Sequence, residues 1–106
     1  MRMKRSQRGG SEPLRIEGEM TIYSAAALAQ RLTATIADAS GRPRLDLSQV
    51  SEIDTAGLQV LLMARKLARA RGGLSVVAAS ARVQALLRLC GLEDMIEGHP
   101  GPASAS

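Results

Sequence analysis

Hydrophobic and polar positions along the chain follow two periods in turn, and each period predicts one kind of element. Residues 13–20, PLRIEGEM, place apolar residues at alternate positions, which is typical of a strand with one buried face. Residues 44–50 show the same alternation in Leu45 and Leu47, and we expect a second strand there. Residues 74–79 form a short continuous apolar run, which indicates a strand buried on both faces.

A helical period follows each predicted strand. Behind Ser24, a favourable N-cap residue, Leu28, Leu32 and Ile36 recur at every fourth position and predict a helix over residues 25–39. The same spacing predicts a second helix over residues 55–70 and a third that begins after residue 80 and is closed by the glycine at 91. Strands that alternate with helices imply parallel neighbours, so the sequence predicts one small α/β domain.

The second helix carries more apolar residues than one core face needs. On a helical projection its core arc is predicted to hold Ala56, Val60, Leu61, Ala64, Leu67 and Ala68. Leu58 and Leu62 fall outside that arc, on the side of Thr55. They are either single leucines covered by a loop or exposed to water, or a docking patch beside a hydroxyl group. We expect burial of Val60, Leu61, Leu67, Val76 and Leu86.

Composition narrows the class of protein. The chain of 106 residues is long enough for one domain, and its 45% apolar content supplies a core that must be aliphatic, because the sequence holds one Tyr and neither Phe nor Trp. A single cysteine excludes an internal disulfide and favours a reducing compartment, so we expect a cytoplasmic protein. We expect no membrane insertion, because no apolar run approaches the roughly 18 residues of a span and no secretory signal is present.

Positive charge gathers at the N-terminus. Four of the 14 Lys and Arg residues lie in the first ten positions, which hold no acid, and the remainder of the chain is formally neutral. Such a segment is either a solvated leader or a contact for nucleic acid or an anionic membrane. Without aromatic residues to stack on bases, we favour the leader and expect no direct contact with nucleic acid. We expect a basic disordered tail over residues 1–11, a compact domain over 12–97 and a disordered tail over 98–106.

The patterns that carry catalysis are missing. The sequence holds no Cys/His cluster for a metal and neither the GxxxxGK[ST] nor the GxGxxG phosphate loop. Thr55 as a nucleophile would need a base, and the one histidine, His99, lies in the C-terminal tail. We therefore expect a binding protein rather than an enzyme, with no catalytic residue, metal or cofactor.

The central stretch LDLSQVSEIDTAGLQVLL, residues 45–62, resembles the signature of STAS domains, the module named after sulfate transporters and anti-sigma factor antagonists. The upstream stretch IEGEMTIYSAAAL is similar to the end of that family's strand and its first helix. The downstream stretch GGLSVVAASARVQALLRLCGLEDMI is similar to its last strand and helix. The resemblance covers residues 13–96 and implies a small sheet of about four strands, with three or so helices packed against it, that binds rather than catalyses.

The anti-sigma factor antagonist branch implies a site and a partner. In that branch an anti-sigma factor that is also a serine/threonine kinase phosphorylates one hydroxyl residue, and Thr55 matches this residue. The resemblance thus implies signal transduction and transcription regulation through the start of the helix after Asp54. The expected partner-binding residues are Asp54, Thr55, Gly57, Leu58, Gln59, Leu62 and Lys66.

Alternatives remain at this site. Many sporulation-type antagonists carry Asp-Ser-Ser-Gly where this chain has Asp-Thr-Ala-Gly. The Asp-Thr-Ala-Gly form also resembles two other groups, chemotaxis-associated STAS proteins and the STAS subunit of phospholipid-transporting ABC systems. That subunit docks on an ATPase and is not known for a phosphoswitch. Thr55, or Asp54 beside it, can also simply cap the helix N-terminus. Gly57 is either a point of close approach for a partner or a packing contact at a crowded helix start, and we favour packing.

Overall fold

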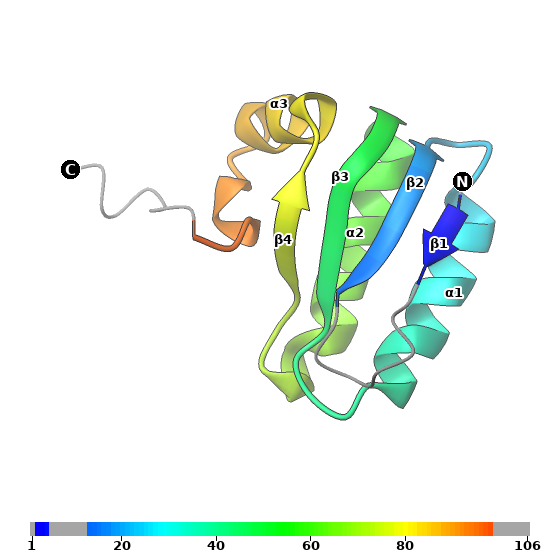
Figure 1. Cartoon of the computed structure of the whole chain (residues 1–106), viewed down its shortest axis with the longest axis vertical. Coiled ribbons are helices and arrows are strands. Elements are labelled where there is room, and N and C mark those ends of the chain that lie inside the picture. Colours follow the sequence, from blue (N-terminus) through cyan, green and yellow to red (C-terminus); the bar gives the residue numbers. More distant parts are fainter. Residues whose placement is uncertain (1, 5–12, 99–106) are drawn as a thin grey trace.

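The period-two stretches form strands and the helical stretches form helices, in the predicted order (Figure 1). The computed structural model describes residues 2–4 and 13–98. Its elements are β1 Arg2–Lys4, β2 Leu14–Met20, α1 Ala25–Asp38, β3 Arg44–Ile53, α2 Thr55–Leu67, the 3-10 helix η1 Ala68–Arg71, β4 Ser75–Ala79, α3 Ala81–Leu89 and the 3-10 helix η2 Glu93–Met95. The predicted α/β class, with three helices packed on a small sheet, is confirmed.

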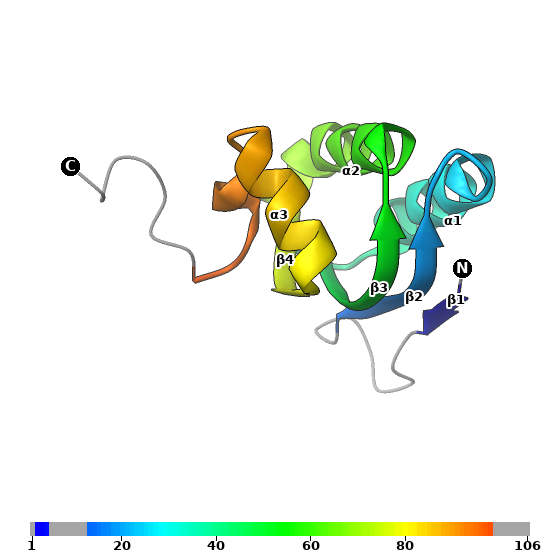
Figure 2. The same cartoon turned by 90° about the horizontal axis from the view of Figure 1, so that it is seen from above.

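The three strands β2, β3 and β4 lie side by side and run parallel. Helix α1 connects β2 to β3, and α2 connects β3 to β4. Figure 2 shows α1 and α2 next to each other on one face of the sheet. Parallel strands end at the same edge of a sheet, and the last residues of β2 and β3, Met20 and Ile53, are paired in register. The loop after β2 therefore lies beside the start of α2.

The two faces of the sheet differ in polarity. Along β2 the residues Leu14, Ile16 and Met20 are buried against the helices. On the alternate positions Arg15 forms ion pairs with Glu17 at 3.7 Å and with Asp46 of β3 at 3.5 Å. The helix-covered face therefore supplies the core, whereas the other face is polar.

Aliphatic side chains fill the core. Their burial can be compared with the residues that the sequence predicts to be buried. Val60, Leu61 and Val76 are buried, as predicted. The prediction is wrong for Leu67, which is 46% exposed, because α2 ends at this residue and the chain continues as a 3-10 helix with a different spacing of side chains. Leu86 is half-buried rather than fully enclosed.

Leu58 corrects the predicted docking patch. Its side chain is only 6% exposed and belongs to the core, although the helical projection placed it on the outer side. The reason is that α2 packs against α1 as well as against the sheet, so its buried arc is wider than one sheet-facing stripe. Leu62 is half-buried and remains on the outer side.

The expected N-terminal tail is also corrected in part. Residues Arg2–Lys4 form β1, which pairs antiparallel with β2 at the edge of the sheet, so this stretch is not disordered. Of the other predicted tail positions, residues 1, 5–11 and 99–106 lie outside the described residues. Within the described part of the chain, no helix combines the length and the apolar content that crossing a bilayer requires.

Candidate functional site

Asp54 lies between the end of β3 and the start of α2. Its carboxylate accepts hydrogen bonds both from α2 and from the loop after β2. Its backbone is extended, and its Oδ1 accepts a hydrogen bond from the Gly57 N–H at 3.1 Å. Its Oδ2 accepts the N–H of Ile22 at 3.0 Å, and its own N–H donates to the Met20 carbonyl at 3.2 Å. The hydrogen bonds from Gly57 and then Ile22 hold the pKa of the Asp54 carboxyl below its usual value. Asp54 is therefore an ionised N-cap that joins α2 to the loop after β2.

Gly57 is required by packing at the helix start. A Cβ atom at this position would lie 2.0 Å from the Met20 carbonyl oxygen and 2.8 Å from its carbon. Both are backbone atoms, so they cannot move aside as a flexible side chain would. Gly57 is buried, which supports the packing interpretation and removes it from the surface that a partner can touch.

Thr55 is the first residue of α2, and its side chain is exposed. Because the Asp54 carboxylate caps the helix, the Thr55 hydroxyl has no capping role, and it makes no hydrogen bond to any other described residue. Of the two capping alternatives, the geometry therefore selects Asp54. The Thr55 hydroxyl lies open to solvent and to a partner at the positive end of the helix dipole.

Two large apolar residues of the loop after β2 lie close to this helix start. Ile22 is 69% exposed and Tyr23 is 92% exposed, and the backbone of Ile22 is held by Asp54. Ser24 shapes the loop from within: its Oγ accepts the Thr21 N–H at 3.0 Å and donates to the Glu19 carbonyl at 2.9 Å. Ser24 sits at the N-cap position of α1, as expected, but its side chain makes no capping hydrogen bond.

Sequence reasoning missed Ile22 and Tyr23 as site residues. The signal was a pair of adjacent large apolar residues between a strand and a helix, off the period of both elements. The contact of Ile22 with Asp54 depends on the parallel pairing of β2 with β3, which no local pattern contains.

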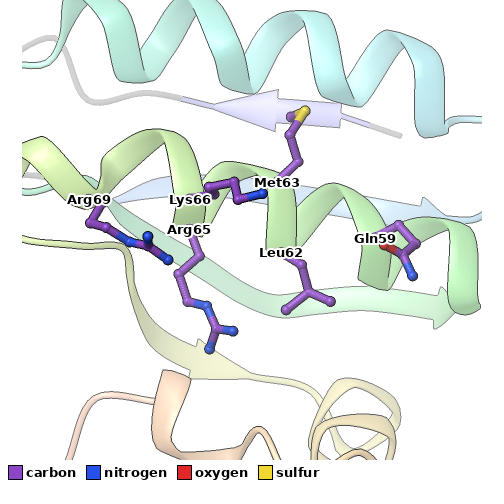
Figure 3. Close-up of a pocket in the computed structure, with 6 residues that line it drawn as sticks. All are labelled: Gln59, Leu62, Met63, Arg65, Lys66 and Arg69. Carbon is purple, nitrogen blue, oxygen red and sulfur yellow. The ribbon is translucent and has the colours of Figure 1, made fainter.

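The outer side of α2 continues the site away from Thr55. Gln59 and Lys66 are exposed and Leu62 is half-buried, and all three line a groove along the helix (Figure 3). Of the seven residues predicted to bind a partner, five therefore share an accessible side of α2 and its cap, namely Asp54, Thr55, Gln59, Leu62 and Lys66. The other two, Gly57 and Leu58, are buried. Among the described residues, no group of three or more His, Cys, Asp or Glu side chains could hold a metal ion.

The fold and this site define a small α/β domain with a carboxylate and an exposed hydroxyl, those of Asp54 and Thr55, at the N-terminus of α2. The chain belongs to the STAS domain family, since the family model described as "Mlab, STAS domain" matches residues 3–97. The expected family resemblance is confirmed. No curated protein matches the sequence.

Two solved structures show how far the likeness extends. A crystal structure of an anti-sigma factor antagonist from Mycobacterium paratuberculosis has a TM-score of 0.75 and 25% identity, over 97% of this chain and 86% of that chain. The anti-sigma factor antagonist SpoIIAA in its unphosphorylated form has a TM-score of 0.71 and 16% identity, over 90% of this chain and 84% of that chain. The second likeness concerns the fold.

Proposed function

We propose that this protein is an anti-sigma factor antagonist-like regulator that acts in the cytoplasm by binding a kinase-type anti-sigma factor. The likeness to anti-sigma factor antagonists supports this partner class. The proposed contact surface is the accessible side of α2 and its cap, with Thr55 as the residue that the kinase phosphorylates. The protein itself carries out no reaction, and it contributes a shape and a switchable charge.

The observation that carries the proposal is the exposed Thr55 hydroxyl beside an aspartate that already caps the helix. Since Asp54 satisfies the Gly57 N–H, modification of Thr55 removes no hydrogen bond that holds the fold. The hydroxyl is therefore available for phosphoryl transfer while the helix start stays formed.

Charge explains how the modification would act. A phosphate on Thr55 would add about −1.5 to −2 charges. The N-terminus of α2 tolerates negative charge, so the domain would stay folded. Asp54 is ionised next to it, however, and a partner that covers this side would have to bury a dianion beside a carboxylate, which is strongly unfavourable. Phosphorylation would thus release the partner without unfolding the domain.

The test is a binding measurement with a kinase-type anti-sigma factor encoded in the same genome. We expect Thr55→Ala to bind it and to lose phosphorylation, and Thr55→Glu to bind about tenfold more weakly or worse. Thr33→Glu is the matched control, because Thr33 is an exposed threonine on α1 whose Oγ donates to the Ala29 carbonyl. Equal binding by Thr55→Glu and wild type would overturn the switch, and no binding by wild type would overturn the partner class.

A second candidate function has support of its own. The matching family model is described by the name Mlab, and the resemblance includes the STAS subunit of phospholipid-transporting ABC systems. In this alternative the same side of α2 docks on a transporter ATPase, and Thr55 is a contact residue without a switch. Chemotaxis-associated STAS proteins are a related alternative. Capture of an ABC ATPase by wild type, with Thr55 never phosphorylated, would favour the transporter alternative.

A further inference from the structure

The groove on the outer side of α2 is lined by cationic and apolar side chains. It has a volume of about 400 Å³ and is lined by Gln59, Leu62, Met63, Arg65, Lys66 and Arg69. Figure 3 shows these side chains projecting from α2 and the turn after it, with Met63 pointing toward α1 and Leu62 and Arg65 toward the β4 side. Three of the six lining residues are cations and none is an acid.

These cations lie in a stretch of the sequence that contains basic residues and no acidic ones. Residues 55–71, which form α2 and η1, hold four Lys or Arg and no Asp or Glu. Residues 12–54 and 72–106 together hold six cations and ten acids. Outside the N-terminal segment, α2 and η1 therefore carry a net positive charge, whereas the remaining residues together are net negative.

The groove cations have no anionic partner among the described residues. The described acids that form ion pairs bind Arg15, Arg44, Arg82 and Arg88, whereas Arg65, Lys66 and Arg69 form none. The helix dipole favours cations in the last turn of α2, but Arg65, Lys66 and Arg69 line one groove, and like charges this close together repel each other. An anionic group in the groove would relieve this repulsion.

We propose that this groove binds an acidic segment of the partner protein, with carboxylates on the three cations and an apolar side chain against Leu62 and Met63. Charge complementarity selects an anionic ligand, and the two half-buried apolar residues select one that also carries hydrocarbon. No aromatic residue lines the groove for bases to stack on, which disfavours single-stranded nucleic acid.

This inference rests on the proposed function, because Gln59, Leu62 and Lys66 belong to the same contact surface. It also deepens the switch. Thr55 precedes Arg65, the nearest of the groove cations, by a helical rise of about 15 Å. This exceeds the Debye length of about 8–10 Å at physiological salt, so repulsion between a Thr55 phosphate and acids in the groove is weak there and grows as the salt concentration falls. A phosphate on Thr55 repels an acidic partner, whereas it would attract a basic one. The sign of the groove therefore agrees with release on phosphorylation.

The test uses a short fluorescein-labelled peptide in which pairs of Glu and Leu alternate, with a Gln/Leu peptide as the neutral probe. We expect wild-type protein to bind the acidic peptide, more weakly as salt rises, and to bind the neutral peptide at least about tenfold more weakly. The groove variant is Arg65→Gln/Lys66→Gln/Arg69→Gln. The matched control variant removes the same charge at exposed arginines outside the groove and is Arg31→Gln/Arg42→Gln/Arg82→Gln.

We expect the groove variant to bind the acidic peptide about tenfold more weakly than wild type, and the control variant to change by less than about twofold, with unchanged thermal unfolding of both. Equal losses in both variants, or loss in neither, would overturn the groove. Binding to phosphatidylglycerol vesicles or to duplex DNA in place of the peptide would also overturn it. If the peptide fails while an anti-sigma factor binds in the Thr55 assay, only the groove inference falls. If the peptide binds while the anti-sigma factor does not, the partner class falls.

Discussion

The carboxylate of Asp54 accepts the backbone N–H of Ile22, a residue 32 positions earlier in the chain, at 3.0 Å. Its other oxygen caps α2 through Gly57. One side chain thus fixes the helix start and the exposed loop after β2 relative to each other. The consequence is a composite surface in which the start of α2 and the exposed loop after β2 lie side by side.

Replacement of Asp54 by Asn separates these two roles. Asn is also a good N-cap, and its carbonyl oxygen can accept the Gly57 N–H, but its amide nitrogen is a donor and cannot accept the Ile22 N–H. We expect Asp54→Asn to lower the melting temperature modestly and to raise hydrogen exchange at the Ile22 amide while the Gly57 amide stays protected. Equal loss of protection at both amides would contradict the division of roles.

The same carboxylate makes stability depend on pH. The pKa of Asp54 in the folded protein lies below its ordinary value of 3.8. Its contribution is therefore fully present above about that value and is lost as the pH falls through the lowered folded pKa. We expect the difference in melting temperature between wild type and Asp54→Asn to be constant near neutral pH and to shrink in this acid range. A difference that stays constant down to the lowest pH would exclude this cause.

Gly57 is expected to tolerate no side chain. In Gly57→Ala the new Cβ would meet the Met20 carbonyl oxygen at 2.0 Å, so the helix start or β2 must shift. We expect a loss of at least about 1–3 kcal/mol in the free energy of unfolding, as for other overpacked sites. Gly41→Ala is the control, because nothing lies within 4 Å of its Cβ position and its φ is not positive. Urea denaturation of both variants makes the comparison, and equal effects would refute the packing role.

Leu58 and Leu62 lie one turn apart on α2, and we expect Leu58 to matter mainly for stability and Leu62 mainly for partner binding. Leu58 is 6% exposed, so Leu58→Ala should cost about 2–5 kcal/mol of unfolding free energy by leaving a cavity in the core. Leu62 is half-buried, and Leu62→Ala should cost less than half as much while weakening partner binding by about 1–3 kcal/mol. Chemical denaturation and binding measurements on both variants test this. The reverse order of stability losses would show that the outer side of α2 is assigned incorrectly.

The loop after β2 yields a prediction about binding alone. Ile22 and Tyr23 are 69% and 92% exposed, so their replacement by Ser removes little buried area from the fold. We expect Ile22→Ser/Tyr23→Ser to leave the melting temperature nearly unchanged and to weaken binding of the proposed anti-sigma factor partner by about 1–3 kcal/mol. Leu89, which is 81% exposed on α3, provides the control as Leu89→Ser. Equal weakening by the control would mean that exposed apolar area in general, not this loop, governs binding.

The local pattern of the sequence determined the elements of this protein. Alternation along β2 and the four-residue spacing along α1 each record which side chains must leave water, and such periods are properties of neighbouring residues. The Asp-Thr-Ala-Gly stretch likewise marks a helix start, because a carboxylate before the first turn satisfies amides only a few residues away. For these features the interacting groups are close in the chain, so the sequence alone contains the information.

Tertiary structure decided which side of α2 is accessible and what lies beside it. The position of Leu58 depends on α1 packing against α2, and the exposure of Leu67 depends on where the helix gives way to a 3-10 turn. The meeting of Ile22 with Asp54 requires β2 and β3 to pair in parallel across 32 residues of chain. A helical projection treats each helix as facing one flat core, whereas the folded chain surrounds α2 from two directions. The contact of Asp54 with the loop after β2 and the set of accessible residues on α2 therefore follow from distances between segments that no local period encodes.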